Sequence, residues 1–136
     1  PRDIFLSIKP KFAELIASRK KTYEFRRYKP KDPVKRIWLY ITSPVSELKY
    51  IAEVGDVVEY PTQIPENGIG NADFNKGLKV SKFGFPIIHL DELMEGIPIG
   101  ELRNRFNFNS PQGFIYTDTF PELVDYVKSC EIRRLY

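Results

Sequence analysis

The segment from Ile4 to Arg27 constrains the fold most, because it changes from a strand pattern to a helix pattern and back within a very short stretch. Pro10 is tolerated in the first turn of a helix, and apolar side chains at helical spacing follow it. Thr22 to Arg27 then alternates in polarity, which predicts a strand with Glu24 and Arg26 on one face. Such short, mixed elements favour a small α+β domain.

The rest of the chain continues this pattern of short strands and single helices. Gly55 is expected to bend one strand, and Thr119 and Glu122 fit a capping box before a helix. The expected strands are 36–42, 50–60, 85–90 and 112–117, with residues 131–136 closing the sheet; the expected helices are 99–106 and 120–128. Because strands and long helices do not alternate, the pattern does not favour a doubly wound parallel sheet. We predict a small mixed β-barrel with peripheral helices.

Length predicts a single domain over residues 1–136, with an irregular insertion loop at about 61–84. Proline and glycine punctuate this loop, residues 71–75 fit one helical turn, and a loop this long is more often functional than idle. Cys130 is the only cysteine, so no internal disulfide is possible and an intracellular location, cytoplasmic or nuclear, is expected. No apolar run approaches the length of a membrane span. The first residue is Pro1 and not Met, so we expect a trimmed N-terminus.

Charge is divided unevenly along the chain. Residues 1–36 contain 12 Lys and Arg against 4 Asp and Glu, whereas residues 37–136 contain 9 against 14. A basic cluster of this kind suits a surface that meets phosphate. Within it, Lys21, Glu24 and Arg26 are expected to converge on one pocket, since half-buried charges must pair or meet a ligand. The alternative is an ordinary ion pair on the surface.

Four segments together carry a resemblance to a known family. They are Ile8-Lys9-Pro10-Lys11-Phe12-Ala13, Lys21-Thr22-Tyr23-Glu24-Phe25-Arg26, Tyr40-Ile-Thr-Ser-Pro-Val45 and Pro111-Gln-Gly-Phe-Ile-Tyr116. They resemble the ASCH family of PUA-like β-barrels, whose signature is Gly-x-Lys-x-x-Glu-x-Arg. The resemblance spans residues 4 to about 117. One position departs from it, since the signature glycine falls on Arg19.

The resemblance implies a cleft that meets nucleic acid, RNA more than DNA, with no cofactor. The residues expected to contact phosphate or a base edge are Lys9, Lys21, Glu24, Arg26 and Arg27, with Ser43 at the rim. The residues expected to stack on a single-stranded or modified base are Tyr40, Phe74, Phe114 and Tyr116, each of which could instead be a core residue. The base preference and the oligomeric state stay open.

Two other functions remain open. Some similar small proteins hydrolyse N4-acetylcytidine with a Lys, a Thr and a Glu. Lys21 matches that lysine, but Glu24 holds the position of the threonine, and Thr22 is a poor substitute. The resemblance also links other members to RNA cleavage. If this chain is a hydrolase that acts on a modified nucleoside or on RNA, Lys21 and Glu24 are the catalytic candidates.

The second alternative is a protein-interaction module that uses Asp91, Glu92 and Glu95. Their spacing suits an exposed turn or helix face better than a metal site. His89 and Cys130 are the only residues of their types, so no structural zinc site is expected. His89 stands among apolar residues and is interpreted as a core or edge residue.

Overall fold

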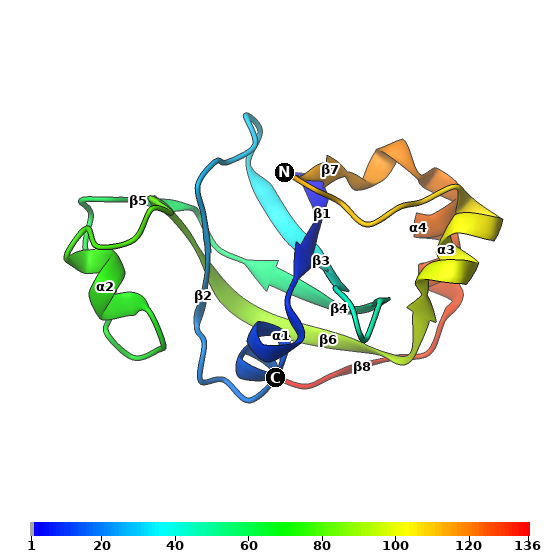
Figure 1. The fold of residues 1–136 in the computed structure, drawn as a ribbon, viewed down its shortest axis with the longest axis horizontal. Coiled ribbons are helices and arrows are strands. Elements are labelled where there is room, and N and C mark those ends of the chain that lie inside the picture. The colour runs from blue at the N-terminus through cyan, green and yellow to red at the C-terminus, as the bar shows by residue number, and fades with distance from the viewer. Residues whose placement is uncertain (1) are drawn as a thin grey trace.

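Eight strands and four α-helices follow one another irregularly in the computed structural model, which describes residues 2–136 (Figure 1). In chain order the elements are β1 (Arg2–Ile8), α1 (Pro10–Ala17), β2 (Tyr23–Arg26), β3 (Val34–Ile41), β4 (Glu47–Val54), β5 (Val58–Glu59), α2 (Asn71–Asn75), β6 (Phe83–Pro98), α3 (Ile99–Phe106), β7 (Ile115–Tyr116), the 3-10 turn η1 (Thr117–Thr119), α4 (Pro121–Ser129) and β8 (Ile132–Arg134). None of the helices within 2–136 is both long and apolar enough to cross a bilayer.

The strands form one curled sheet in the order β2-β6-β4-β3-β1-β7, with β5 and β8 also paired to β6. β1 and β3 are parallel, and every other pairing is antiparallel. β6 runs through both halves, since Phe83–Pro86 pairs with β2 whereas Ile87–Pro98 pairs with β4. This long, bent strand curls the sheet into a half-barrel around α1 (Figure 1). The α+β half-barrel with peripheral helices confirms the predicted fold class.

Two apolar clusters lie on the two faces of the sheet. On the inner face, Ile4 and Leu6 of β1 pack with Ile37 and Leu39 of β3 and with Ile16 of α1. On the outer face, Phe5, Trp38 and Tyr40 of the same strands pack against α3 and α4, which contribute Leu102, Leu123 and Val127. Strands buried on both faces explain why 36–42 is almost continuously apolar.

The predicted helices 99–106 and 71–75 match α3 and α2, and residues 131–136 close the sheet through β8. The single strand predicted over 50–60 is wrong. It begins earlier and divides at Gly55 into β4 and β5, where Gly55 lies tightly against Pro86. The capping box is also wrong, because Thr119 belongs to η1 and α4 has no side-chain cap.

The strand predicted over 85–90 continues to Pro98, so Asp91 and Glu92 lie in β6 and not in an exposed turn. The reason is an ion-pair ladder with β8. Arg134 Nε lies 3.1 Å from Asp91 Oδ1, and Arg133 Nη2 lies 3.0 Å from Glu92 Oε1. Cross-strand pairs of opposite charge stabilise a sheet, so acidic residues fit a strand here.

Candidate functional site

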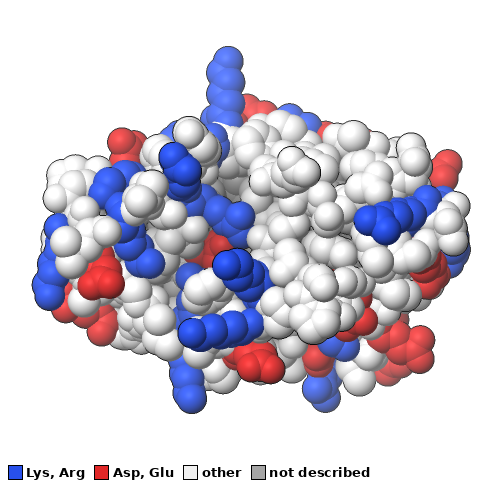
Figure 2. All heavy atoms as spheres, in the orientation of Figure 1, with Lys and Arg blue, Asp and Glu red and all other residues white. Residues whose placement is uncertain are grey.

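A cavity of about 850 Å³ opens between the two ends of the curled sheet. Its walls are β1, the start of α1, β2 and the loop that follows β2, together with parts of the loops before β6 and β7. The side chains that line it include Lys9, Phe12, Lys21, Glu24, Arg26, Arg27, Tyr28, Lys79, Ser81 and Phe114. Lys and Arg gather over the side of the molecule that holds α1 and β2, around a hollow (Figure 2).

Lys21, Glu24 and Arg26 meet inside this cavity. Glu24 Oε1 lies 3.5 Å from Lys21 Nζ, and Glu24 Oε2 lies 2.6 Å from Arg26 Nη2. Arg26 Nε also donates a hydrogen bond to Glu24 Oε2 at 2.8 Å. The side chains of Lys21 and Glu24 are only 9% and 8% exposed, so this is a half-enclosed charged cluster and not a solvated surface pair. The expected convergence of the three charges is therefore observed.

Arg26 also links the two ends of the half-barrel. Its Nη2 donates to the backbone carbonyl of Ser7 on β1 at 2.7 Å. The Ser7 hydroxyl in turn donates to the carbonyl of Pro111 at 2.6 Å, which holds the segment before Phe114 against β1. One guanidinium thus positions Glu24, β1 and the wall that carries Phe114.

The turn between α1 and β2 determines where Lys21 lies. α1 ends at Ala17, and Arg19 takes the left-handed conformation with φ 65°. The backbone N–H of Lys21 then donates to the carbonyl of Leu15 at 2.9 Å, which folds the chain back beneath the helix. Left-handed residues are usually glycine, so the position that departs from the signature is one where glycine would be unstrained.

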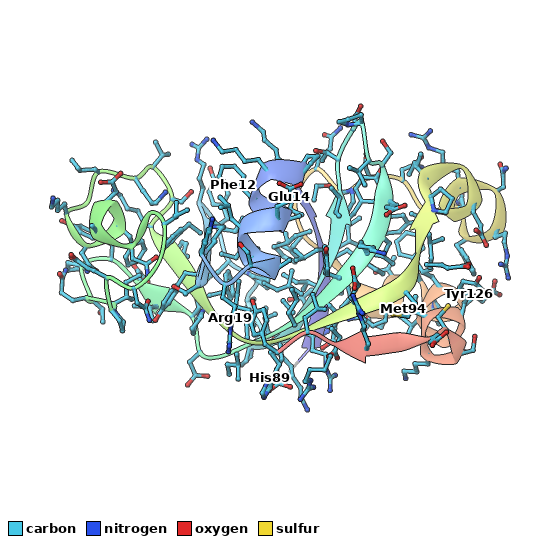
Figure 3. All side chains as sticks on the ribbon, turned by 90° about the horizontal axis from the view of Figure 1, so that it is seen from below. Phe12, Glu14, Arg19, His89, Met94 and Tyr126 are labelled. Atoms are coloured by element: carbon cyan, nitrogen blue, oxygen red, sulfur yellow. The ribbon has the colours of Figure 1, made fainter. Side chains whose placement is uncertain are left out.

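Arg19 does not add a cation to the cavity lining. Its guanidinium lies 4.3 Å from the ring centroid of Tyr136, whose hydroxyl donates to the carbonyl of Ile16 at 2.8 Å. Figure 3 shows Arg19 beyond the end of α1 and well apart from Phe12, which lines the cavity. The side chain therefore stabilises the end of α1, and this contact offsets part of the strain of a left-handed arginine.

Burial lowers the pKa of Lys21, because a charged ammonium loses hydration in this half-enclosed site. The carboxylate of Glu24 opposes that change, whereas the positive charges of Lys79 and Arg26 reinforce it. The Lys21 ammonium also lies 4.8 Å from the ring centroid of Phe25. A lysine of lowered pKa that faces an open cavity is characteristic of functional sites.

All four basic residues predicted from sequence, Lys9, Lys21, Arg26 and Arg27, line the cavity. Lys9 and Arg27 are exposed on its walls, and Phe114 lines it at 38% exposure. Ser43, expected at the rim, is an exposed residue of the β3–β4 loop outside the cavity lining. Tyr116 is also outside the lining; the Arg2 guanidinium stacks 3.3 Å from its ring centroid.

Two of the aromatic candidates are core residues and are removed from the site. Tyr40 is 3% exposed and packs with Phe108 in the outer cluster beneath α3 and α4. Phe74 is 1% exposed, and its ring stacks on Phe25 with centroids 5.2 Å apart. Neither ring has a free face for a base.

Thr22, the possible substitute nucleophile, does not line the cavity. Its hydroxyl donates a hydrogen bond to Oδ1 of Asn67 instead.

The sequence patterns did not identify Phe12, Tyr28, Lys79 or Ser81 as site residues, although all four line the cavity. Tyr28 is 74% exposed beside Arg27, and Phe12 is 38% exposed on α1. Phe12 lies within the apolar pattern of the helix, which predicts burial, and Tyr28 lies in a loop without periodicity. Lys79 comes from the irregular insertion, and nothing in its neighbours indicates that it returns to the cavity.

The acidic surface proposed for a protein partner is largely neutralised. Asp91 pairs with Arg134, and Glu92 pairs with Arg133 and also lies 3.7 Å from Lys49. His89 is a half-buried strand residue opposite Glu53 and is not among the cavity residues. These observations leave the basic cavity as the stronger candidate site.

Comparison with known proteins identifies the family and the fold. A model of the ASCH domain matches residues 6–99. The fold resembles crystal structures of an ASCH protein from Zymomonas mobilis. A serine-to-alanine variant of that protein superposes with a TM-score of 0.73 at 23% sequence identity, and the match covers 96% of this chain and 97% of that chain. A tyrosine-to-phenylalanine variant gives 0.71 at 22% identity, covering 96% and 100%, and the protein without a named substitution gives 0.66 at 24% identity, covering 96% of each chain. No curated protein sequence matches significantly. The fold is thus PUA-like, as the resemblance implied, and the chain belongs to the ASCH domain family.

Proposed function

We propose that this protein binds RNA in the basic cavity between β1 and β2. ASCH domains are generally RNA-binding modules, and the family membership supports the same class of partner here. The observation that carries the proposal is the cavity itself: about 850 Å³, with cations on its walls, exposed rings at its mouth and one buried carboxylate inside. Ligand pockets commonly have volumes of about 300–1,000 Å³.

The cations on the walls suit a sugar–phosphate backbone. Lys9 and Arg27 are exposed and carry no carboxylate partner within 4 Å among residues 2–136, and neither does Lys79. Such side chains contact phosphates, steer association and release counterions on binding. Arg26 is held by Glu24 and Ser7, so its main role is to position the carboxylate.

The interior suits an unstacked base. Phe12, Tyr28 and Phe114 are the exposed rings among the lining residues, and stacking on an aromatic side chain stabilises a bound base by about 1–3 kcal/mol. Glu24 Oε2 accepts from Arg26, but Oε1 has only the 3.5 Å contact with Lys21. This oxygen can accept a hydrogen bond from an exocyclic amine of a base. Single-stranded RNA offers such bases, so we expect RNA to bind in unpaired form.

Fluorescence anisotropy with labelled oligonucleotides tests the proposal. We expect single-stranded RNA to bind more tightly than duplex RNA or single-stranded DNA. If Lys9, Arg27 and Lys79 each contact a phosphate, the logarithm of the association constant should fall with the logarithm of the salt concentration with a slope of about −2. Lys21→Ala and Arg26→Ala should weaken binding, whereas Lys128→Ala, an exposed lysine on α4, should not. Absent or salt-insensitive binding by the folded parent protein would overturn the proposal.

A hydrolase is the second candidate, favoured by one observation: Lys21 has a lowered pKa and faces an open cavity. An uncharged lysine can act as a general base. The threonine that similar enzymes use has no counterpart in the cavity lining, since Thr22 contacts Asn67 instead. Acetate release from N4-acetylcytidine that disappears in Lys21→Ala would support this function. No turnover at high protein concentration would exclude this reaction.

A further inference from the structure

Lys79 reaches the cavity from the insertion between α2 and β6, outside every segment of the family signature. Its ammonium lies 4.8 Å from the ring centroid of Phe25, the same distance as the ammonium of Lys21. The two nitrogens are therefore within about 10 Å of each other. Two lysines from distant parts of the chain share one aromatic ring at the α2 end of the cavity.

The insertion is built to hold Lys79 in this position. Gly70 has φ 88°, and a Cβ there would lie 2.9 Å from Cε of Lys79, so the glycine leaves room for the lysine stem. The ammonium of Lys82 donates to the backbone carbonyls of Gly77 and Lys79 and so ties the loop together. Phe74 fastens the insertion to the ring of Phe25. Lys79 is thus held against the cavity by specific contacts.

Positive charge exceeds negative charge at this end of the cavity. Lys21, Arg26 and Lys79 face one carboxylate, Glu24, and Arg26 holds that carboxylate at 2.6 Å. Like charges that are partly buried repel one another, and the positive charge of Lys79 contributes to the lowered pKa of Lys21. A bound anion would remove this repulsion, whereas a neutral ligand would not.

We propose that Lys79 and Lys21 form a phosphate-binding subsite over Phe25, with the hydroxyl of Ser81, which also lines the cavity, as a further donor. This inference rests on the proposed function, since the phosphate belongs to a bound RNA. The nucleotide attached to this phosphate would share the cavity with the exposed rings of Tyr28 and Phe114. The group is either an internal phosphodiester or a terminal phosphate monoester.

Salt-dependent RNA binding tests the subsite against a matched control. Lys76 is exposed on the same insertion but does not line the cavity, so Lys76→Ala removes the same charge elsewhere. We expect Lys79→Ala to weaken single-stranded RNA binding about five- to tenfold and to reduce the salt slope by about 0.7, with Lys79→Arg retaining the parent slope. Lys76→Ala should leave both unchanged. Equal effects of Lys79→Ala and Lys76→Ala would overturn the proposal.

The same titration identifies the source of the phosphate. A larger effect of Lys79→Ala on 5′-phosphorylated RNA than on 5′-hydroxyl RNA assigns the subsite to a terminal phosphate, and an equal effect assigns it to an internal phosphodiester. If the parent binds no RNA, the proposed function fails and inorganic phosphate becomes the probe. Saturable NMR shifts of Lys79 and Ser81 that Lys79→Ala abolishes and Lys76→Ala retains would still support the subsite. Absent or unsaturable shifts would overturn it.

Discussion

Replacing Glu24 by glutamine removes one charge and keeps the shape of the side chain. Glu24 lies 3.5 Å from Lys21 Nζ, and at an effective dielectric constant of about 20 this contact alone amounts to roughly 5 kcal/mol. In the variant, deprotonation of Lys21 would reduce the loss of stability that comes from a partly buried ammonium without a carboxylate partner. From the ordinary lysine pKa of 10.5, deprotonation costs about 5 kcal/mol at pH 7, and burial makes it cheaper. We therefore expect Glu24→Gln to lower the free energy of unfolding by about 3 kcal/mol at pH 7.

The loss of stability in Glu24→Gln should also depend on pH. The pKa of Lys21 is lower in the folded protein than in the unfolded chain, so stability rises with pH between the two values. Glu24 raises the pKa of Lys21 in the folded protein. In Glu24→Gln this pKa is lower, so the free energy of unfolding begins to increase with pH at a lower pH than in the parent. The difference in free energy of unfolding between the parent and Glu24→Gln should therefore decrease as pH rises, by up to about 1.4 kcal/mol per pH unit. Measurements below pH 10 avoid the tyrosines, since burial raises the pKa of Tyr23, Tyr50 and Tyr136.

Urea unfolding followed by the fluorescence of Trp38, which is buried and the only tryptophan, measures this effect. Unfolding curves at pH 6, 7, 8 and 9 give the free energy at each pH by linear extrapolation. Glu14→Gln is the control, because Glu14 is exposed on α1, and it should change stability by less than about 0.5 kcal/mol. If Glu24→Gln is as mild as this control, or if its deficit does not shrink as pH rises, the argument for a coupled half-buried cluster is refuted.

Three further expectations concern the turn, the insertion and the mouth of the cavity. Arg19→Gly should be about 0.5–1 kcal/mol more stable than Arg19→Ala in urea, because only glycine relieves the left-handed strain; equal stabilities would contradict this. Phe74→Ala should destabilise the protein by about 3 kcal/mol and weaken RNA binding by loosening the insertion; an RNA affinity that stays at the parent value in the folded variant would argue against that coupling. Tyr28→Ala and Phe114→Ala should each weaken RNA binding by about 1–3 kcal/mol in anisotropy titrations, whereas Met94→Ala, on the exposed side of β6, should not; an effect no larger than that of Met94→Ala would exclude stacking.

Local patterns were sufficient for part of the fold. Pro10 and the helical spacing after it predict α1, and Ile99–Phe106 has the bounds predicted from sequence. The spacing of Lys21, Glu24 and Arg26 also predicts their convergence, because residues two apart on a strand share a face. Each of these signals lies within a few neighbouring residues, so no tertiary information is needed.

The remaining features depend on partners far away in the sequence. β6 continues through Asp91 and Glu92 because β8 supplies arginines more than forty positions later. The position of Tyr40 on a strand does not show whether its ring is exposed. The ring is buried because α3 and α4, which lie far away in the sequence, cover this face of the sheet. Lys79 reaches the site through the anchoring of its loop by Phe74 and Lys82. Single-sequence patterns contain none of these contacts.

NMR mapping with single-stranded RNA and the isotope-labelled protein shows directly whether RNA binds in the cavity. We expect saturable chemical-shift changes that are largest at cavity residues, such as Lys9, Arg27, Tyr28 and Phe114, and small on α3, α4 and β8. Shifts confined to α3, α4 and β8, or no shifts at RNA concentrations well above that of the protein, would contradict it.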